Sequence, residues 1–256
     1  MKIGILGAGG RMGRMLIAEV LSGHYSCTLG AAVDHANHGQ DAGGGVKISA
    51  DAEAAFKICD TLIDFTAPAA SVEHAGLAQK YKKALVIGTT GFGEAQDAAI
   101  DDAARAAPIL RSYNMSVGVN VLAALVAQVA ARLENDFDIE IFEAHHRHKV
   151  DAPSGTALLL GDAAAKGRGV KLKDVMVADR TGHTGARKPG TIGMSVFRGG
   201  DVIGDHTVTF AGAGERIELS HKASDRAIFA RGAVRAAVWL NGKPPGLYAM
   251  KDVLGL

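Results

Sequence analysis

The chain has 256 residues, enough for one large domain or two modest ones, and 48% of them are hydrophobic although only 5% are aromatic. This composition suits an alanine- and valine-rich α/β protein. The formal net charge of +1 excludes a global electrostatic attraction to nucleic acid or to an anionic membrane surface. Two cysteines do not make a disulfide framework and no secretory signal is visible, so we expect an intracellular, cytoplasmic protein.

The N-terminal segment predicts a strand, a glycine loop and a helix. Residues Lys2–Leu6 form a short apolar strand, and the glycine-rich segment Gly7–Gly13 comes before an amphipathic helix. Such a loop lets the backbone approach a pyrophosphate, and the helix N-terminus supplies N–H groups and a positive dipole. Gly7 and Gly9 match the first two glycines of the dinucleotide fingerprint, although Met12 occupies the third position and Gly13 follows it.

Asp34 strengthens this interpretation. It ends the predicted strand Thr28–Val33, about the expected distance after the glycine loop, where a carboxylate can bond the ribose hydroxyls of NAD. The two features together predict a Rossmann domain at the N-terminus.

Further βα units follow. The predicted elements are a strand Thr61–Phe65, a helix of about Ala69–Lys82, a strand Ala84–Ile87, a helix of about Glu94–Ala106 and the short segment Pro108–Leu110. Ligands bind at the carboxyl ends of parallel strands, so Gly88, Thr89 and Thr90 are candidates for the nicotinamide end of the cofactor. Ordinary turn chemistry also explains these three residues by spacing alone. The segment Ser112–Met115 closes the first lobe.

A long uncharged segment, Ser112–Ala131, reaches the length needed to cross a bilayer. Polar residues such as Asn114, Asn120 and Gln128 interrupt it, and the predicted helix covers only about Val119–Leu133. We therefore expect a buried helix between the lobes and no membrane association.

The most informative stretch runs from Glu143 to Thr156, which we call the cationic stretch. It follows Phe137–Glu143, where apolar and acidic residues alternate as in a strand with one buried face. Three histidines, an arginine and a lysine come next. Ser154 can then serve as the N-cap of a helix that continues through Thr156–Ala165. Cations beside a helix N-terminus predict a site for an anion.

Other interpretations of the cationic stretch remain. Zinc binding is disfavoured because the three histidines lack the i, i+4 pair of a helical zinc site and both cysteines lie far away in the sequence. A nucleic-acid site would need more net charge and aromatic side chains for stacking. A solvated charge run without a role stays open, although three residues that titrate near neutral pH favour catalysis.

The C-terminal third predicts a polar mobile loop and three strands before a final helix. The loop spans roughly Lys171–Pro189, the strands Thr191–Arg198, Val202–Phe210 and Glu215–His221 are expected to be antiparallel, and the helix covers about Ser224–Leu240. With the strand before His145, these strands make a mixed sheet.

Five segments together resemble the bacterial 4-hydroxy-tetrahydrodipicolinate reductases, also called dihydrodipicolinate reductases, along almost the whole chain. They are Gly7–Gly13, Ile87–Phe92, Asn114–Asn120, Glu143–Ala157 and His221–Ser224. The resemblance implies an α/β fold in which a Rossmann dinucleotide-binding domain (residues 1–116 and 223–256) is joined to an α+β domain with a mixed open sheet. That second domain (residues 117–222) would bind substrate and form a homotetramer. The implied reaction is reduction of 4-hydroxy-tetrahydrodipicolinate with NADH or NADPH, on the diaminopimelate and lysine route.

The resemblance also implies roles for individual residues. His145 would be the general acid/base and Lys149 the proton donor, while His146, Gly155 and Thr156 would hold the cyclic dicarboxylate. The cofactor would contact Gly7, Ala8, Gly9, Gly10, Arg11 and Met12 at the pyrophosphate, Asp34 at the adenosine ribose, and Gly88, Thr89, Thr90, Ser112, Tyr113, Asn114 and Met115 on the nicotinamide side. No metal is expected, and Arg147 and His148 receive no role.

His35 departs from relatives that carry an arginine after the ribose-binding acid. A neutral imidazole is a poorer partner for a 2′-phosphate than a guanidinium, so we predict that NADH is used at least as well as NADPH. Two alternatives remain at this stage: an NAD-dependent dehydrogenase of another dicarboxylate, and a non-catalytic NAD-binding redox sensor. The sensor does not require the cationic stretch.

Overall fold

Strand β1 (Lys2–Leu6) lies inside an eight-stranded sheet in the computed structural model, which describes residues 1–256. The sheet belongs to the first of two units, Met1–Val117 with Ala227–Gly255, and the second unit is Gly118–Arg226. The strand order is β13-β7-β6-β5-β1-β2-β4-β3, and all neighbours pair in parallel except β3 with β4. The other strands are β2 (Thr28–Val33), β3 (Asp41–Gly43), β4 (Val46–Ser49), β5 (Thr61–Asp64), β6 (Ala84–Ile87), β7 (Pro108–Arg111) and β13 (Gly246–Tyr248).

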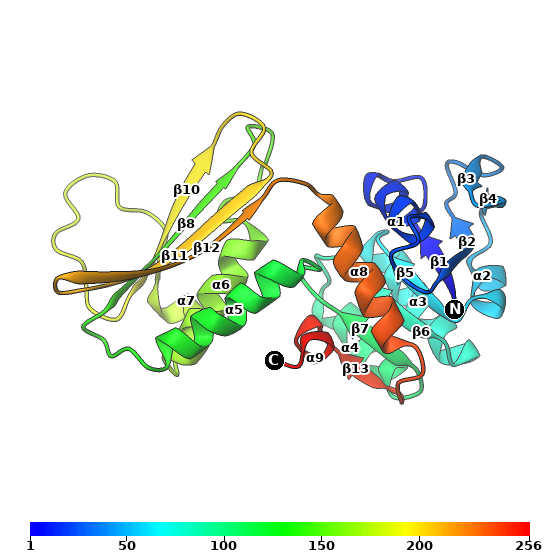
Figure 1. Ribbon diagram of the computed structural model, residues 1–256. Coiled ribbons are helices and arrows are strands. Elements are labelled where there is room, and N and C mark those ends of the chain that lie inside the picture. The colour runs from blue at the N-terminus through cyan, green and yellow to red at the C-terminus, as the bar shows by residue number, and fades with distance from the viewer. The chain divides into compact units, whose positions relative to one another are not determined.

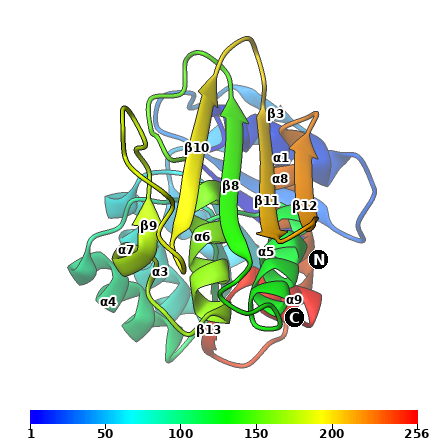
Figure 2. The ribbon, with the colours of Figure 1, turned by 90° about the vertical axis from the view of Figure 1, so that its left-hand side faces the viewer.

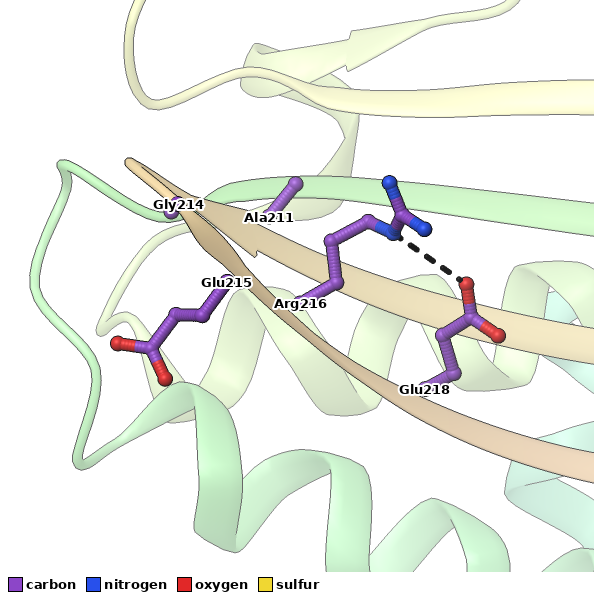
Figure 3. Close-up of a pocket in the computed structure, with 6 residues that line it drawn as sticks. Ala211, Gly214, Glu215, Arg216 and Glu218 are labelled. Atoms are coloured by element: carbon purple, nitrogen blue, oxygen red, sulfur yellow. Dashed lines mark ion pairs between the residues drawn. The ribbon is translucent and has the colours of Figure 1, made fainter.

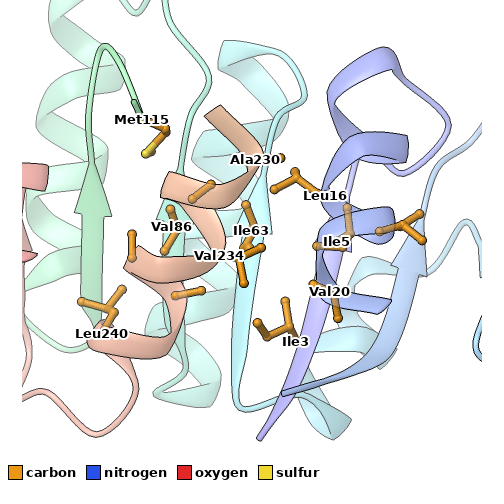
Figure 4. Packing of buried hydrophobic residues seen from close by; sticks show 14 of the residues in the cluster. Ile3, Ile5, Leu16, Val20, Ile63, Val86, Met115, Ala230, Val234 and Leu240 are labelled. Carbon is orange, nitrogen blue, oxygen red and sulfur yellow. The ribbon is translucent and has the colours of Figure 1, made fainter. Parts of the chain in front are cut away.

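Helices cover both faces of this sheet (Figure 1). One layer holds α1 (Arg11–Leu21), α8 (Ala227–Leu240) and α9 (Met250–Leu254), and the other holds α2 (Ala52–Ile58), α3 (Pro68–Tyr81) and α4 (Glu94–Ala104). Strand residues alternate between the layers: Ile63 and Val86 join the first core, and their neighbours Leu62 and Leu85 join the second. Figure 4 shows α1 and α8 packed on the strands through Leu16 and Val234. The predicted Rossmann fold is confirmed.

The second unit is built on a five-stranded mixed sheet with the order β12-β11-β8-β10-β9. Its elements are α5 (Val117–Ala130), β8 (Asp138–His145), α6 (Gly155–Gly167), α7 (Leu172–Val175), β9 (Met176–Val177), β10 (Ile192–Arg198), β11 (Gly204–Gly212) and β12 (Glu215–Ala223). Apolar residues of β8 and β11 meet α5 and α6 in one core, including Ile141, Val208 and Leu160. Figure 2 shows α5 and α6 behind the sheet, while the face toward the viewer carries no helix. This is the mixed open sheet that was predicted.

Two details of the second unit differ from the sequence prediction. Strand β10 runs parallel to β8, and β8 lies between β10 and β11, so the segment around Gly199–Gly200 joins two strands that are not neighbours. The predicted loop Lys171–Pro189 begins with α7 and β9. Adjacency in sequence favoured a hairpin, but the apolar strand β8 is more completely buried with a neighbour on each side.

Helix α5 belongs to the second unit and is only partly buried, whereas the sequence predicted a buried helix. It contains 14 residues and buries Val119, Leu122 and Val126, whereas Leu125 is exposed. No helix in the structure has both the length and the apolar character needed to cross a membrane.

Candidate active site

The glycine loop of the first unit closes tightly on itself. Gly7 has a φ of +83°, which favours glycine, and the N–H groups of Gly7 and Ala8 both donate to the carbonyl oxygen of Val33 at 2.9 Å. A Cβ placed on Gly13 would lie 2.0 Å from the carbonyl oxygen of Gly7. The fingerprint assigns close packing between helix and strand to its third glycine. Gly13 allows this packing although it comes one residue later than the fingerprint position, which Met12 occupies.

The start of α1 offers a site for a phosphate. Gly9 donates its N–H to Asp34 and Gly10 donates to the carbonyl oxygen of Gly7, so these two groups are already used within the loop. Helix α1 has no side-chain N-cap, which leaves the first-turn N–H groups of Arg11 and Met12 without a capping partner. A cavity of about 420 Å³ borders the loop at Ala8 and Gly9. The residues present fit a dinucleotide pyrophosphate.

Asp34 is fixed at the end of β2, beside the glycine loop. Its carboxylate accepts hydrogen bonds from the N–H of Gly9 at 3.0 Å, the N–H of Ala36 at 2.9 Å and the side-chain amide of Asn37 at 3.2 Å. Partial burial alone would raise the pKa of Asp34, but these hydrogen bonds outweigh it and lower the pKa. The result is an oriented, ionised carboxylate at the position expected for a ribose contact.

A buried polar network joins the ends of β5 and β6. Asp64 is fully buried and accepts from the hydroxyl of Thr66 at 2.6 Å and from the N–H of Thr66 at 2.9 Å, and its other oxygen lies 3.0 Å from Nδ1 of His74. Thr66 also donates its N–H to Oγ1 of Thr89 at 3.1 Å. A Cβ on the neighbouring Gly88 would overlap the ring of Phe65 at 2.1 Å. This packing holds the strand ends where the nicotinamide was expected.

The residues of the segment Ser112–Met115 differ in their exposure to solvent. Ser112 donates its hydroxyl to the carbonyl oxygen of Asn114 at 2.8 Å, and Tyr113 is exposed. Met115 is buried in the core beneath α8, where a Cβ on Gly232 would lie 1.7 Å from the Met115 carbonyl oxygen. The side chain of Met115 therefore serves packing.

In the second unit, β8 carries the first part of the cationic stretch. Glu143 and His145 point to the same side as Ile139 and Ile141, toward the helices, and both are buried. The carboxylate of Glu143 lies 2.5 Å from Nδ1 of His145 through Oε2. Burial alone would raise the pKa of Glu143, but the hydrogen bonds from Arg198 and His145 outweigh it and lower the pKa.

Arg198 and Ser154 hold the loop after β8 against the strand. Arg198 donates to both oxygens of Glu143, at 2.8 and 2.7 Å, and to the carbonyl oxygen of Asp151 at 2.6 Å. Ser154 donates its N–H to Glu143 at 3.0 Å, and its hydroxyl accepts from the N–H of Ala157 at 3.2 Å as the N-cap of α6. The start of α6 at Gly155 is thereby tied to the end of β8.

His206 of β11 completes the buried cluster. Its ring meets that of His145 edge-on, with centroids 5.1 Å apart, and its Nε2 lies 3.2 Å from the hydroxyl of Ser154. Burial and, to a lesser extent, the neighbouring His145 lower the pKa of His206 to about 4. The Nδ1 atom of His206 has no hydrogen-bond partner. His206 is therefore neutral near pH 7.

The remaining cations of the stretch lie nearer the surface. Lys149 is half-buried and its ammonium pairs with Asp151 at 2.7 Å. The rings of His146 and His148 are 6.3 Å apart, and Arg147 is exposed. His145 has a lowered pKa because of burial, an effect that the contact with Glu143 partly offsets. The strand end thus presents a histidine and a lysine beside the start of α6.

The ligand atoms of Glu143, His145 and His206 lie within 4.8 Å of one another, close enough to consider a metal ion. Both Glu143 oxygens already accept hydrogen bonds from Arg198, whose positive charge opposes a second cation. The cluster is better suited to moving a proton than to holding a metal.

A larger cavity, of about 710 Å³, lies at the β11–β12 hairpin (Figure 3). It is lined by Glu215, Arg216 and Glu218 among small residues, with Arg216 and Glu218 paired at 3.7 Å. Ala211 and Gly212 line it at the end of β11 away from Gly204 and His206. This cavity is separate from the histidine cluster.

Comparison with known proteins decides the family. Residues 1–115 match the family model described as dihydrodipicolinate reductase, N-terminus, and residues 118–254 match the model described as dihydrodipicolinate reductase, C-terminus. The chain belongs to the dihydrodipicolinate reductase family. It is 54% identical over 262 residues to 4-hydroxy-tetrahydrodipicolinate reductase 1 of Mesorhizobium japonicum, covering 98% of this chain and 96% of that one. The 4-hydroxy-tetrahydrodipicolinate reductase of Brucella abortus (strain 2308) is 53% identical, with 98% of each chain covered.

Solved structures agree on the fold of this reductase family. Dipicolinate-bound dihydrodipicolinate reductase from Paenisporosarcina sp. TG-14 gives a TM-score of 0.80 at 24% identity and covers 98% of each chain. An amine dehydrogenase from Mycobacterium smegmatis gives 0.60 at 12% identity, covering 98% of this chain and 95% of that chain.

Three members of the buried cluster did not emerge as site residues from the sequence. Glu143 opens the cationic stretch but received no role of its own, and Arg198 and His206 were not singled out. His206 carried a usable signal, because the alternation of its strand places it on the same face as the apolar residues Val208 and Phe210. Nothing local marks Arg198, which lies 55 residues from its partner Glu143.

Proposed function

We infer that this protein reduces 4-hydroxy-tetrahydrodipicolinate to tetrahydrodipicolinate with NADH or NADPH, in diaminopimelate and lysine biosynthesis. The observation that carries this conclusion is the match to both reductase domains, with identity above 50% along 98% or more of the chain to relatives of that name. The overall change consumes a hydride and a proton and releases water from the 4-hydroxyl group.

The two units divide the binding tasks in this proposal. The first unit would hold the dinucleotide, with the pyrophosphate at the N–H groups of Arg11 and Met12, and with the adenosine ribose at Asp34. Support comes from the uncapped start of α1 and from the cavity beside the glycine loop. The nicotinamide, when bound, supplies the hydride. Gly88–Thr90 and Ser112–Met115 would line its side of the site.

The second unit would hold the dicarboxylate. Its substrate-binding residues would be His146, Gly155 and Thr156, because a helix N-terminus and neighbouring cations attract carboxylates. The Paenisporosarcina relative has a dicarboxylate, dipicolinate, bound. A non-catalytic redox sensor would not require a helix N-terminus with neighbouring cations.

His145 would act as the general acid/base and Lys149 as the proton donor. Hydride addition at one end of a conjugated imine leaves negative charge at the other end, and that charge must meet a proton donor. His145 ends β8 beside the start of α6, and the pairing of Lys149 with Asp151 keeps an ammonium at the same loop. A positive group there stabilises the developing anion before or during proton transfer.

A coupled assay tests the proposed reaction. A dihydrodipicolinate synthase would generate the unstable substrate, and absorbance at the nicotinamide band would report NADH oxidation. We expect oxidation that depends on both the synthase and this protein. NADH oxidation that stays at background would refute the specific reaction, and oxidation with other dicarboxylates instead would favour the related dehydrogenase.

The open sheet of the second unit supports a homotetramer. One face of this sheet carries no helix (Figure 2). Strand alternation and register place Phe142 and Phe197 on that face, and these side chains are 45% and 48% exposed. Large apolar side chains on an uncovered sheet face favour burial against another copy. Light scattering should give four times the chain mass, and Phe142→Asp should lower it. Val170→Asp, at a similarly exposed site after α6, should leave the mass unchanged.

A cytoplasmic location belongs to the same proposal. Cys27 and Cys59 are both free thiols, as expected in a reducing compartment. Cell fractionation should therefore recover the protein with cytoplasmic markers, and recovery with another compartment would contradict this part of the proposal.

A further inference from the structure

All the hydrogen-bond positions of the buried Glu143 carboxylate are filled. Oε1 accepts from the N–H of Ser154 and from Arg198, and Oε2 accepts from Arg198 and contacts His145 Nδ1. Glu143 is only 1% exposed, so water has little access to this carboxylate. Because the bidentate arginine keeps Glu143 ionised, the carboxylate can only accept. His145 Nδ1 must therefore be the donor in this contact.

This requirement fixes the tautomer of His145. With the proton on Nδ1, Nε2 is the acceptor in the neutral ring and the donor in the protonated ring. Nε2 faces the backbone of Gly204, where a Cβ would approach it to 3.0 Å. A side chain at position 204 would crowd Nε2, and the glycine leaves this side of the ring uncrowded.

The charged and titratable groups around His145 come from four segments. They are Glu143 on β8, Arg198 on β10, His206 on β11, and His146 and Lys149 in the loop after β8. Glu143 is the only anion among them. It alone among these groups favours the protonated imidazole, and the two cations and the burial oppose it.

We propose that Glu143, clamped by Arg198, is the positioning residue of His145 and makes Nε2 the nitrogen that exchanges the proton of the reaction. Glu143 acts through His145, and it ties the same histidine to the start of α6 through Ser154. The inference rests on the proton-transfer role of His145 in the proposed function.

Glu143→Gln is the sharpest variant because it keeps the size and removes the charge. The amide NH2 group would face two donors at the Oε1 position, Arg198 and the Ser154 N–H, but only one fixed donor at the Oε2 position. The amide therefore prefers to place its NH2 group at the Oε2 position, where it points toward His145. His145 must then accept at Nδ1 and carry its proton on Nε2. We expect kcat to fall by about 10²- to 10⁴-fold, the range for general acid–base and orienting groups.

Two readouts separate positioning from a merely structural role. Ring ¹⁵N NMR of labelled histidine should show the Nδ1–H tautomer of His145 in the wild type and the Nε2–H tautomer in Glu143→Gln. The limb of the kcat/KM profile that reports His145 should also move to lower pH, because the imidazolium loses its carboxylate. The NADH dissociation constant should stay unchanged.

Glu140→Gln is the matched control. Glu140 lies on the same strand but on the opposite face, and it also pairs with arginines, Arg180 at 2.7 Å and Arg187 at 3.3 Å. It contacts no histidine, so the NMR tautomer and the pH profile should remain those of the wild type.

The wild-type tautomer needs no variant, so the proposal stays testable even if Glu143→Gln fails to fold. An Nε2–H tautomer in the wild type, or a folded Glu143→Gln enzyme with an unchanged pH profile, would overturn the positioning role. A wild-type protein without activity in the coupled assay would instead overturn the proposed function, and the two failures are therefore distinct.

Discussion

Gly13 packs directly on the carbonyl oxygen of Gly7, so that a Cβ at position 13 would lie only 2.0 Å away. The overlap is with backbone, which cannot rotate aside, and the start of α1 would have to move. We expect Gly13→Ala to weaken NADH binding by about tenfold or more, equivalent to about 1.4 kcal/mol. Isothermal titration measures this directly.

Gly76→Ala is the control for that substitution. Gly76 lies within α3 and no heavy atom is found within 4 Å of a Cβ built there. The alanine should leave NADH binding unchanged and stabilise the protein by about 0.5–1 kcal/mol, because a helical glycine loses more backbone entropy on folding. Equal effects of the two alanines on NADH binding would argue against the role of Gly13.

The Arg198–Glu143 pair should contribute far more to stability than a surface pair. Arg198→Met leaves the buried Glu143 carboxylate without its cation, and we expect a loss of about 3–5 kcal/mol in the free energy of unfolding. Arg216→Met removes one partner of the exposed Arg216–Glu218 pair and should cost less than about 1 kcal/mol. Urea unfolding of both variants gives the comparison, and similar losses would contradict the prediction.

His206 predicts a dependence of stability on pH. Its pKa is about 4 in the folded protein, below the ordinary value of 6.5. Between these two pH values the unfolded chain binds a proton that the folded protein does not bind. This difference does not affect the free energy of unfolding above pH 6.5. As the pH falls from 6.5 toward 4, the free energy of unfolding decreases by on the order of 3 kcal/mol because of His206.

Glu143, His145 and His221 also have lowered pKa values, so their contributions change with pH in the same direction. His206→Gln can isolate the share of His206, because its amide can still reach the hydroxyl of Ser154. The difference between wild type and variant should shrink as the pH falls from 6.5 to 4 in urea titrations. A difference in the free energy of unfolding that does not change with pH would show that His206 does not cause the pH dependence.

Lys149→Ala tests the proposed proton donor. The ammonium would act on the developing anion and not on the dinucleotide, so kcat should fall by about 10²-fold or more while NADH affinity stays unchanged. Lys173→Ala, on the exposed surface of α7, should change neither quantity. An unchanged kcat for Lys149→Ala would remove this residue from the mechanism.

The choice of cofactor follows from the end of β2. Asp34 presents an oriented carboxylate there, and His35 is exposed beside it. A 2′-phosphate would meet the Asp34 carboxylate and an imidazole in place of the planar, bidentate guanidinium that suits a phosphate. We therefore expect kcat/KM for NADH to equal or exceed that for NADPH at neutral pH. A tenfold preference for NADPH in steady-state kinetics would show that another cation binds the phosphate.

The histidine stretch illustrates how far sequence reasoning reached. Period-two alternation placed a strand before His145, and the N-cap signal at Ser154 placed the start of α6; the structure has both features. The same reasoning expected a polar mobile loop over Lys171–Pro189 and an antiparallel β10. The loop segment begins with α7 and β9, and β10 runs parallel to β8. The antiparallel expectation was wrong because the length of a connection does not reveal which strand will be inserted between two others.

The sequence by itself determined the local elements: the glycine loop before a helix, the acid that ends β2, and a cationic strand end beside a capped helix. These depend on backbone conformation and hydrogen bonds within a few residues. Only the tertiary structure decided that Arg198 and His206 join Glu143 and His145. Strands β10 and β11 flank β8 in the sheet, and their registers place Arg198 opposite His145 and His206 opposite Glu143. Register between distant strands is set by burial of the whole sheet face, which no local pattern records.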